Sequence, residues 1–354
     1  MTNSIPCTAK QCARRVFLLV GFHLLLALTF VPAAQAAQAV ASPVVEGVGA
    51  VSLVVSDLDR SVDFYSRVLA FEKVSDVEAF GSDVERLQGL FGVRMRIVRM
   101  RLGGESIELT EFLTPQGRPM PLDSRGNDRW FQHVAVIVGD MDRAYQRLRE
   151  HQVKHASTGP QLLPAYLKNA SGIRAFYFRD PDGHFLEILQ FPPDKGDAKW
   201  HRPGATLFLG IDHTAIVVAD TDASLRFYRD TLGMHVAGES ENYGTEQEHL
   251  NNVFGARLRI TALRAAHGPG IELLEYLAPR DGRPMPPDSR ANDLWAWKTT
   301  LATRQADSVA DALRKGRHPL VSSGLVTLAD DRVGFRTGLL VRDPDGHIVQ
   351  FAVE

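Results

Sequence analysis

Two residue types that bind metal ions stand inside apolar segments of this sequence. Glu187 interrupts the run FLEILQF, and His133 and His213 lie near the starts of QHVAVIVGD and IDHTAIVVAD. Imidazole and carboxylate groups are ligands for borderline divalent ions such as Zn²⁺, Ni²⁺, Co²⁺, Fe²⁺ and Mn²⁺. A lone strand histidine is more often a hydrogen-bonded core residue, and a lone glutamate usually faces solvent. The meaning of these residues therefore depends on which elements bring them together.

Glu187 belongs to a hairpin that occurs twice. The segment GIRAFYFRDPDGHFLEILQF turns at Asp-Pro-Asp-Gly, where proline sets φ at the second position and glycine allows a positive φ. The chain ends with the same design, GLLVRDPDGHIVQFAVE, with Gln350 in place of Glu187. A hairpin that recurs with its turn intact indicates an internal repeat. We interpret His184 and His347, which follow the two turns, as turn-packing residues.

The repeat extends over most of the chain. IDHTAIVVAD matches VGAVSLVVSD, IELLEYLAP matches IELTEFLTP, and GRPMPPDSRANDLW matches GRPMPLDSRGNDRW almost letter for letter. Each unit reads as a strand, an amphipathic helix and three further strands. The sequence therefore predicts four β-α-β-β-β modules, at residues 46–115, 130–192, 208–279 and 294–354.

Residues 1–39 are predicted to form a secretory signal peptide. Lys10, Arg14 and Arg15 precede an apolar run from Val16 to Val31, and small-x-small cleavage sites follow. The arginine pair also fits a twin-arginine signal. The run is short for a transmembrane helix, which needs about 20 apolar residues. We therefore expect a periplasmic or secreted protein with no stable membrane association after cleavage.

The composition of the mature chain narrows its chemistry. Removing the three signal cations from the 40 Lys and Arg leaves 37 against 42 Asp and Glu, so the formal charge changes from −2 to about −5. No basic stripe indicates nucleic acid binding. Both cysteines, Cys7 and Cys12, lie in the signal segment, which excludes disulfides and thiolate catalysis in the mature chain. The sequence also lacks a GxSxG elbow and a phosphate-binding glycine loop.

The segment IDHTAIVVADTDASLRFYRDTLGM, the IEL strands and both DPDGH hairpins resemble the vicinal oxygen chelate (VOC) superfamily. That superfamily includes glyoxalase I, methylmalonyl-CoA epimerase, extradiol dioxygenases and antibiotic-resistance proteins, and the resemblance covers essentially the whole mature chain. It implies an α+β fold in which four βαβββ modules form two half-open mixed-sheet barrels, with the metal inside. We expect VOC domains at 46–192 and 208–354, joined by a linker at 193–207.

The resemblance also implies a set of metal ligands, because the superfamily takes them from the first and last strands of each module. The corresponding first-strand residues are Ala50, His133, His213 and Lys298, and the last-strand residues are Glu108, Glu187, Glu272 and Gln350. Only the second and third modules offer both a histidine and a glutamate. The implied cofactor is one divalent ion (Zn, Ni, Co, Fe or Mn) bound by His133, Glu187, His213 and Glu272.

The pairing of the modules decides whether these residues meet. Pairing in sequence order, as in extradiol dioxygenases, gives two incomplete ligand sets. Pairing the second module with the third and the first with the fourth, as in fused two-domain glyoxalases, gives one complete set. In that case Lys298 joins Glu108 in the other barrel, where its ammonium group could replace a metal ion. We favour the crossed pairing, and sequential pairing stays open because Lys298 could equally neutralise Glu272.

The resemblance implies several functions. The first is a glyoxalase-like or epimerase-like lyase or isomerase for a small substrate with vicinal oxygens, with Glu187 or Glu272 as the catalytic base. The second is an extradiol-type ring-cleaving dioxygenase, which needs two histidines and one carboxylate and so predicts that Glu272 is not a ligand. The third is a non-enzymatic periplasmic binding protein for a small molecule such as a drug, which needs no metal. The chain is expected to be a monomer or homodimer, and the sequence does not name its substrate.

Overall fold

The computed structural model describes residues 44–202 and 206–353, so the predicted signal peptide lies outside the described residues. Within these ranges, no helix has both the length and the apolar character needed to cross a membrane. The described residues form a mixed α+β structure with two mixed sheets, which confirms the predicted fold class.

One sheet is built from the first and fourth modules, and we call it sheet 1+4. The first module contributes β1 (Gly47–Val54), α1 (Leu58–Leu69), β2 (Glu72–Phe80), α2 (Ser82–Gln88), β3 (Arg94–Leu102) and β4 (Glu105–Thr114). The fourth contributes β14 (Lys298–Thr303), α6 (Ala306–Lys315), β15 (Val326–Thr327), β16 (Thr337–Arg342) and β17 (Ile348–Val353). The strand order is β15-β16-β17-β14-β1-β4-β3-β2, with the antiparallel pair β14 and β1 at the centre.

The other sheet is built from the second and third modules, and we call it sheet 2+3. The second module contributes β5 (Gln132–Val138), α3 (Met141–Glu150), β6 (Lys154–His155), β7 (Gln161–Leu162), β8 (Arg174–Arg179) and β9 (Phe185–Gln190). The third contributes β10 (Phe208–Val218), α4 (Thr221–Leu225), a π-helical turn (Arg226–Thr231), β11 (His235–Tyr243), α5 (Thr245–Asn251), β12 (Arg257–Arg264) and β13 (Gly270–Ala278), after a short 3₁₀ turn at Ala198–His201. Its order is β11-β12-β13-β10-β5-β9-β8-β6.

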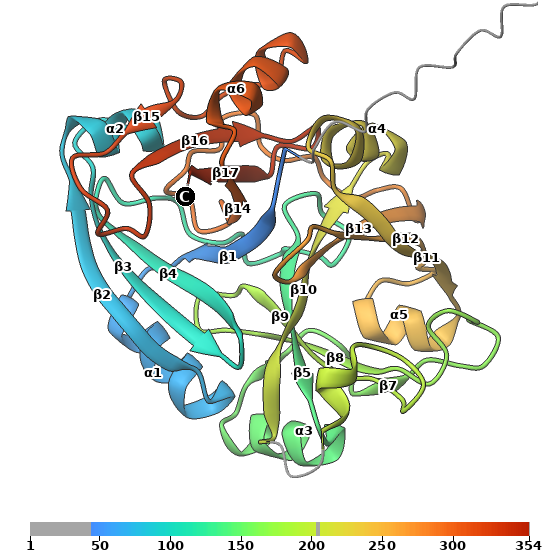
Figure 1. The fold of residues 1–354 in the computed structure, drawn as a ribbon. Coiled ribbons are helices and arrows are strands. Elements are labelled where there is room, and N and C mark those ends of the chain that lie inside the picture. The colour runs from blue at the N-terminus through green and yellow to red at the C-terminus, as the bar shows by residue number, and fades with distance from the viewer. Residues whose placement is uncertain (1–43, 203–205, 354) are drawn as a thin grey trace, which may run out of the picture. The chain divides into compact units, whose positions relative to one another are not determined.

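The modules therefore pair in the crossed arrangement. β1 pairs with β14 and β5 pairs with β10, in both cases antiparallel. In Figure 1 the blue and teal strands of the first module lie beside the red strands of the fourth, while the green, yellow and orange strands form the other sheet. Each sheet thus takes one module from residues 46–192 and one from residues 208–354.

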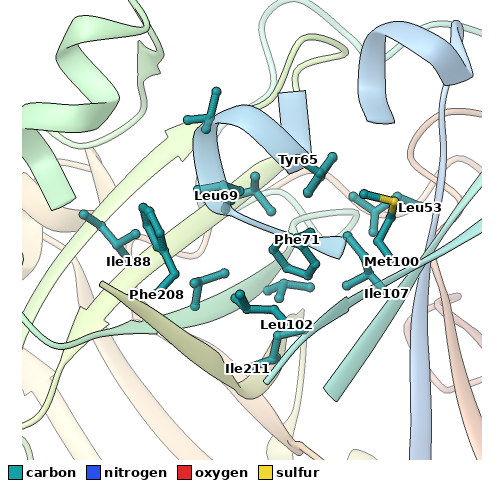
Figure 2. Packing of buried hydrophobic residues seen from close by; sticks show 14 of the residues in the cluster. Leu53, Tyr65, Leu69, Phe71, Met100, Leu102, Ile107, Ile188, Phe208 and Ile211 are labelled. Carbon is teal, nitrogen blue, oxygen red and sulfur yellow. The ribbon is translucent and has the colours of Figure 1, made fainter. Parts of the chain in front are cut away.

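A shared hydrophobic core connects the two sheets through α1. Asp57 caps this helix by accepting a hydrogen bond from the backbone N–H of Arg60, as its position before an apolar-periodic segment predicts. Tyr65 and Leu69 point from α1 into the core, where residues of β3 and β4 meet residues of β9 and β10 (Figure 2). Burial of these side chains removes apolar surface from water, which favours a fixed arrangement of the two sheets.

The two DPDGH hairpins fasten segments from different modules, which explains why the sequence repeats them. His184 Nδ1 lies 2.8 Å from Asp180 Oδ2, and its Nε2 lies 2.8 Å from the backbone oxygen of Leu294. The hydroxyl of Tyr65 donates to Asp180 at 3.2 Å, so one turn holds residues of three modules. His347 contacts Asp343 at 3.1 Å in the same way. The interpretation of His184 and His347 as turn-packing residues is confirmed.

The repeated GRPMP motifs form a reciprocal clasp. Arg118 of the first copy binds Asp293 of the second at 2.7 Å, and Arg283 of the second binds Asp128 of the first at 2.6 Å. Gly117, directly before Arg118, is the residue that fits here sterically, because a Cβ at this position would lie 1.7 Å from the backbone oxygen of Asn292. The two linkers between modules are therefore bound to each other, which stabilises the crossed pairing.

Candidate metal centre

Sheet 2+3 brings the four predicted ligands together at its centre. His133 on β5 and His213 on β10 belong to adjacent antiparallel strands, in a register that places an alanine opposite each histidine. The parallel neighbours β9 and β13 place Glu187 and Glu272 beside these alanines. Because alternate residues of a strand share a face, all four side chains lie on one face of the sheet. The small alanines leave room for the four side chains to converge.

The donor atoms of these residues are close enough to share one ion. His133 Nε2 lies 3.1 Å from Glu187 Oε2 and 3.4 Å from His213 Nε2. His213 Nε2 lies 3.4 Å from Glu272 Oε2 and 3.6 Å from Glu187 Oε2. Bonds of about 2.1 Å to one ion place neighbouring donors about 3.0 Å apart in an octahedron and about 3.4 Å apart in a tetrahedron. The spacing therefore fits a single divalent ion.

Burial distinguishes the two carboxylates. His133, Glu187 and His213 are buried and form the compact group, with all three donor atoms within 4.8 Å of one another. The side chain of Glu272 is 24% exposed, and its carboxylate lies 3.4 Å from His213 Nε2, outside the compact group that the described residues form. Glu187 is thus the shared inner carboxylate, whereas Glu272 is the one more open to an incoming molecule.

The carboxylates around His213 carry negative charge that a cation at this centre would balance. Burial lowers the pKa of His213, but the carboxylates of Glu272, Asp212 and Glu187 outweigh it and raise the pKa to about 9. In the metal-free protein a proton on His213 therefore balances part of the carboxylate charge at neutral pH. A divalent ion bound at Nε2 would replace that proton, so the residues present fit the metal that the resemblance implies.

Asp212 and Arg264 support His213 from behind and were not identified from the sequence. Asp212 Oδ2 lies 3.0 Å from His213 Nδ1, and Arg264 Nη2 donates to both Asp212 carboxylate oxygens at 2.9 Å. Burial raises the pKa of Asp212, but His213 and Arg264 reverse this effect and lower it. A carboxylate on Nδ1 leaves Nε2 free for the metal and orients the ring. The position of Asp212 directly before His213 was the available sequence signal.

His133 has a different environment. Its Nδ1 has no hydrogen-bond partner among the described residues. Its ring instead packs against Phe131, at 5.5 Å between centroids, and against Tyr177, at 4.9 Å. On the side of the ring away from Glu187, aromatic packing thus takes the place of the carboxylate that contacts Nδ1 of His213.

A cavity of about 920 Å³ lies over the ligand cluster and is lined by Glu187, His213 and Glu272. Tyr177 also lines it. Burial, together with the negative charge of Glu187, raises the pKa of Tyr177 well above its usual value, so its hydroxyl remains a hydrogen-bond donor. The volume lies within the range of about 300–1,000 Å³ that is usual for small-molecule sites.

Sheet 1+4 brings together the other four positions, but in a closed site. Lys298, Glu108 and Gln350 line a cavity of only about 20 Å³, which is room for about one water molecule. Ala50 is buried and offers no ligand atom. Phe335 and Leu328, from the segments around β15 and β16, also line this cavity. One barrel is therefore open over the candidate metal centre, and the other is filled by its own side chains.

Lys298 does not form the close pair with Glu108 that the sequence suggested. Within the described ranges, the cation within 4 Å of Glu108 is Arg99, at 3.4 Å, and the hydroxyl of Ser52 donates to Glu108 at 2.7 Å. Lys298 lies 5.3 Å from the ring centre of Phe112. Burial lowers the pKa of Lys298 to about 8, and the attraction of Glu108 offsets only part of this effect.

Comparison with known protein families agrees with this architecture. The model for the Glyoxalase/Bleomycin resistance protein/Dioxygenase superfamily matches residues 47–188 and 210–351. These two matches cover most of the chain, which therefore belongs to this superfamily.

Two individual proteins illustrate the relationship. A 2-epi-5-epi-valiolone epimerase from Actinomyces sp. is 32% identical over 149 residues, which are 40% of this chain and 78% of that protein. The crystal structure of glyoxalase I from Zea mays matches with a TM-score of 0.58 at 15% identity, over 87% of this chain and 92% of that one. The second comparison concerns the fold alone.

Proposed function

We propose that the chain is a metal-dependent enzyme that transfers a proton at a carbon next to a carbonyl group, as an epimerase, isomerase or glyoxalase-like lyase. The observation that carries this proposal is the convergence of the side chains of His133, Glu187, His213 and Glu272, three of which, Glu187, His213 and Glu272, line a cavity of about 920 Å³. The similarity to an epimerase supports the isomerase form and a small hydroxylated ketone as the substrate class.

The four residues would hold the metal through two Nε2 atoms and two carboxylate oxygens. When bound, a divalent ion with open positions supplies Lewis acidity to two adjacent substrate oxygens. The protein residues then have separate tasks. Asp212 and Arg264 orient the His213 ring, and the aromatic rings around His133 exclude water from that side.

Glu272 and Glu187 are the candidate bases. They occupy equivalent positions on the last strands of two repeated modules. Glu272 lies beside Ala215 of β10, and Glu187 lies beside Ala135 of β5. Two carboxylates that approach a substrate from equivalent modules could remove a proton on one face and return it on the other, which is the requirement for inversion at carbon. Glu272 is more exposed, and we assign the first proton transfer to its carboxylate oxygen.

The test begins with metal analysis of purified protein and continues with proton exchange. Metal-loaded protein is incubated in D₂O with 2-epi-5-epi-valiolone, and deuterium at the carbon next to the carbonyl is followed by NMR. We expect one metal ion per chain and exchange that requires both the ion and Glu272. Protein without a stoichiometric ion would refute the enzyme and support a small-molecule binding protein. Glu272→Gln should abolish exchange.

A second candidate is a ring-cleaving oxygenase, which the compact group His133, Glu187 and His213 favours. Two histidines and one carboxylate are the ligand set of non-haem Fe(II) oxygenases. Under this proposal Glu272→Gln keeps Fe²⁺ binding and oxygen uptake with a catechol. Oxygen consumption by wild-type protein with Fe²⁺ and catechol would support the oxygenase. Deuterium exchange into the hydroxyketone, without oxygen consumption on catechol, would support the isomerase or lyase.

The cellular location, partners and assembly are also proposals. We propose export to the periplasm or secretion on the basis of residues 1–39, which lie outside the described ranges. A small-molecule substrate is the expected partner. A monomer or homodimer is the expected assembly.

A further inference from the structure

A chain of four polar side chains runs through the wall of the cavity in sheet 2+3. Asn242 Nδ2 donates to Gln247 Oε1 at 3.1 Å, and Gln247 Nε2 donates to Asn251 Oδ1. Asn251 Nδ2 then donates to the Tyr276 hydroxyl at 2.8 Å, and that hydroxyl donates to the backbone oxygen of Gly126 at 2.9 Å. All four side chains are buried, and Asn242 and Gln247 line the cavity. We call these four residues the amide relay.

One backbone oxygen fixes the direction of every bond in the amide relay. The oxygen of Gly126 can only accept, so Tyr276 must donate to it and accept from the amide nitrogen of Asn251. Burial raises the pKa of Tyr276, so the hydroxyl keeps its proton. Asn251 therefore presents its oxygen to Gln247, and Gln247 presents its oxygen to the amide nitrogen of Asn242. The atom left at the end of the relay is the amide oxygen of Asn242, Oδ1. This buried oxygen accepts no hydrogen bond from the residues in the described ranges.

The first module provides an internal comparison. In sheet 2+3 Asn242 is opposite Leu258, which is opposite Tyr276; in sheet 1+4 Ala79 is opposite Met95, which is opposite Phe112. The helices α5 and α2 correspond as well. The residues equivalent to Asn242, Gln247, Asn251 and Tyr276 are therefore Ala79, Val84, Gln88 and Phe112.

This comparison shows that the fold does not require the amide relay. Ala79, Val84 and Phe112 belong to a hydrophobic cluster that performs the same packing with apolar side chains. A buried polar chain with an unused acceptor costs free energy relative to such a cluster. The relay occurs in the half with the open cavity and the complete ligand set. In the closed half three of the four equivalent residues are apolar, and the fourth, Gln88, is a single buried amide whose Oε1 has no hydrogen-bond partner among the described residues.

We propose that Asn242 Oδ1 is the acceptor of a substrate-recognition site for a hydroxyl group, held in direction by Gln247, Asn251 and Tyr276. The oxygen is covered in this structure, so the proposal requires the Asn242 side chain to rotate until Oδ1 reaches the cavity that this residue already lines. This inference rests on the proposed function, since it assigns the cavity to the substrate of the metal centre. It specifies an uncharged substrate group that donates a hydrogen bond.

The position of the site also bears on substrate size. On the sheet, Asn242 lies two strands and four residues from Glu272, which corresponds to about 10 Å across and about 13 Å along the strands. Twist of the sheet and the inward reach of both side chains shorten this separation within the cavity. A ligand that contacts both residues is therefore larger than a three-carbon compound. A ring or chain with several hydroxyl groups meets the requirement.

The test uses a variant whose residues come from the closed half of the same chain. Asn242→Ala, Gln247→Val, Asn251→Gln and Tyr276→Phe are combined in one protein, with Asn242→Ala alone as the second variant. Thermal unfolding is measured together with binding of erythritol, sorbitol and myo-inositol to zinc-loaded protein by calorimetry. Glu108→Gln, in the closed cavity, is the matched control.

We expect wild-type protein and the control to bind at least one polyol, and both relay variants to bind it about tenfold more weakly, as loss of one buried hydrogen bond implies. The thermal midpoint of the combined variant should not fall, because its residues pack well in the other half. Equal polyol binding in all proteins, no polyol binding to wild type, or a lower midpoint of the combined variant would each overturn the proposal. Polyol discrimination without deuterium exchange would instead reject the proposed reaction while leaving this site in place.

Discussion

Replacing Lys298 with methionine should stabilise the protein at neutral pH. The lysine is 3% exposed, and burial is the main cause of its pKa of about 8, below the ordinary 10.5. Between these two values the unfolded chain binds more protons than the folded chain, so the free energy of unfolding rises with pH in that window. Below pH 8 the full cost of the buried ammonium is present.

The size of the effect follows from this difference. At roughly 1.4 kcal/mol per pKa unit, the step from 10.5 to about 8 corresponds to about 3 kcal/mol at pH 7. An unfolding entropy of about 2.1 cal/mol/K per residue over roughly 310 residues gives ~0.65 kcal/mol/K, so the melting temperature should rise by about 5 °C. Methionine preserves the length of the side chain and fills the same space without a charge.

The assay compares thermal unfolding of wild type and Lys298→Met in chelator at pH 7 and at pH 10.5. We expect the difference of about 5 °C at pH 7 to become small at pH 10.5, where the wild-type lysine is largely neutral. Lys315→Met, at an exposed position of α6, is the control and should change little. A lower melting temperature for Lys298→Met at pH 7 would refute the reasoning, because it would mean that the ammonium group stabilises Glu108 as a substitute for a metal ion.

Three further predictions concern the metal and the signal peptide. His133→Ala and His213→Ala should each weaken metal binding strongly in calorimetry, while Glu108→Ala leaves it intact; the opposite result would move the site to sheet 1+4. Chelation should lower the melting temperature of metal-loaded protein, since an ion at a hundredfold excess over its Kd stabilises the folded state by about 2.7 kcal/mol. An unchanged midpoint would contradict a buried site. Amino-terminal sequencing should find mature protein starting at or near Ala37 or Val40, and a stable membrane-bound form starting at Met1 would contradict export.

A metal-free preparation should also show the pH dependence of His213. Its pKa is raised to about 9 from an ordinary 6.5, so its contribution to the free energy of unfolding is complete below pH 6.5 and is lost as pH rises through 9. His213→Gln should remove this loss of stability, measured by urea unfolding between pH 6 and 9.5. A wild-type profile without a decline in this window, after allowance for Lys298, would contradict the charge assignment at the centre.

The sequence determined the features that repeat. Local turn chemistry fixed the DPDG hairpins, and the two-residue period of the strands fixed which residues share a face, so the positions of His133 and Glu187 on first and last strands follow from local pattern alone. The matched segments also determined the register of the modules, which is why all eight ligand positions correspond in the two sheets.

Only the tertiary structure decided which modules meet. The strand pairing of β5 with β10 joins residues about 80 positions apart, and nothing in a local pattern distinguishes it from pairing of the second module with the first. Side-chain packing decided the rest: Phe335 and Leu328 fill one barrel, Arg99 rather than Lys298 approaches Glu108, and Arg264 reaches Asp212 from another strand. The amide relay likewise depends on contacts between β11, α5 and β13 that no single segment encodes. Period and turn residues are local properties of a chain, whereas the contents of a cavity depend on side chains that meet only after the sheets have formed.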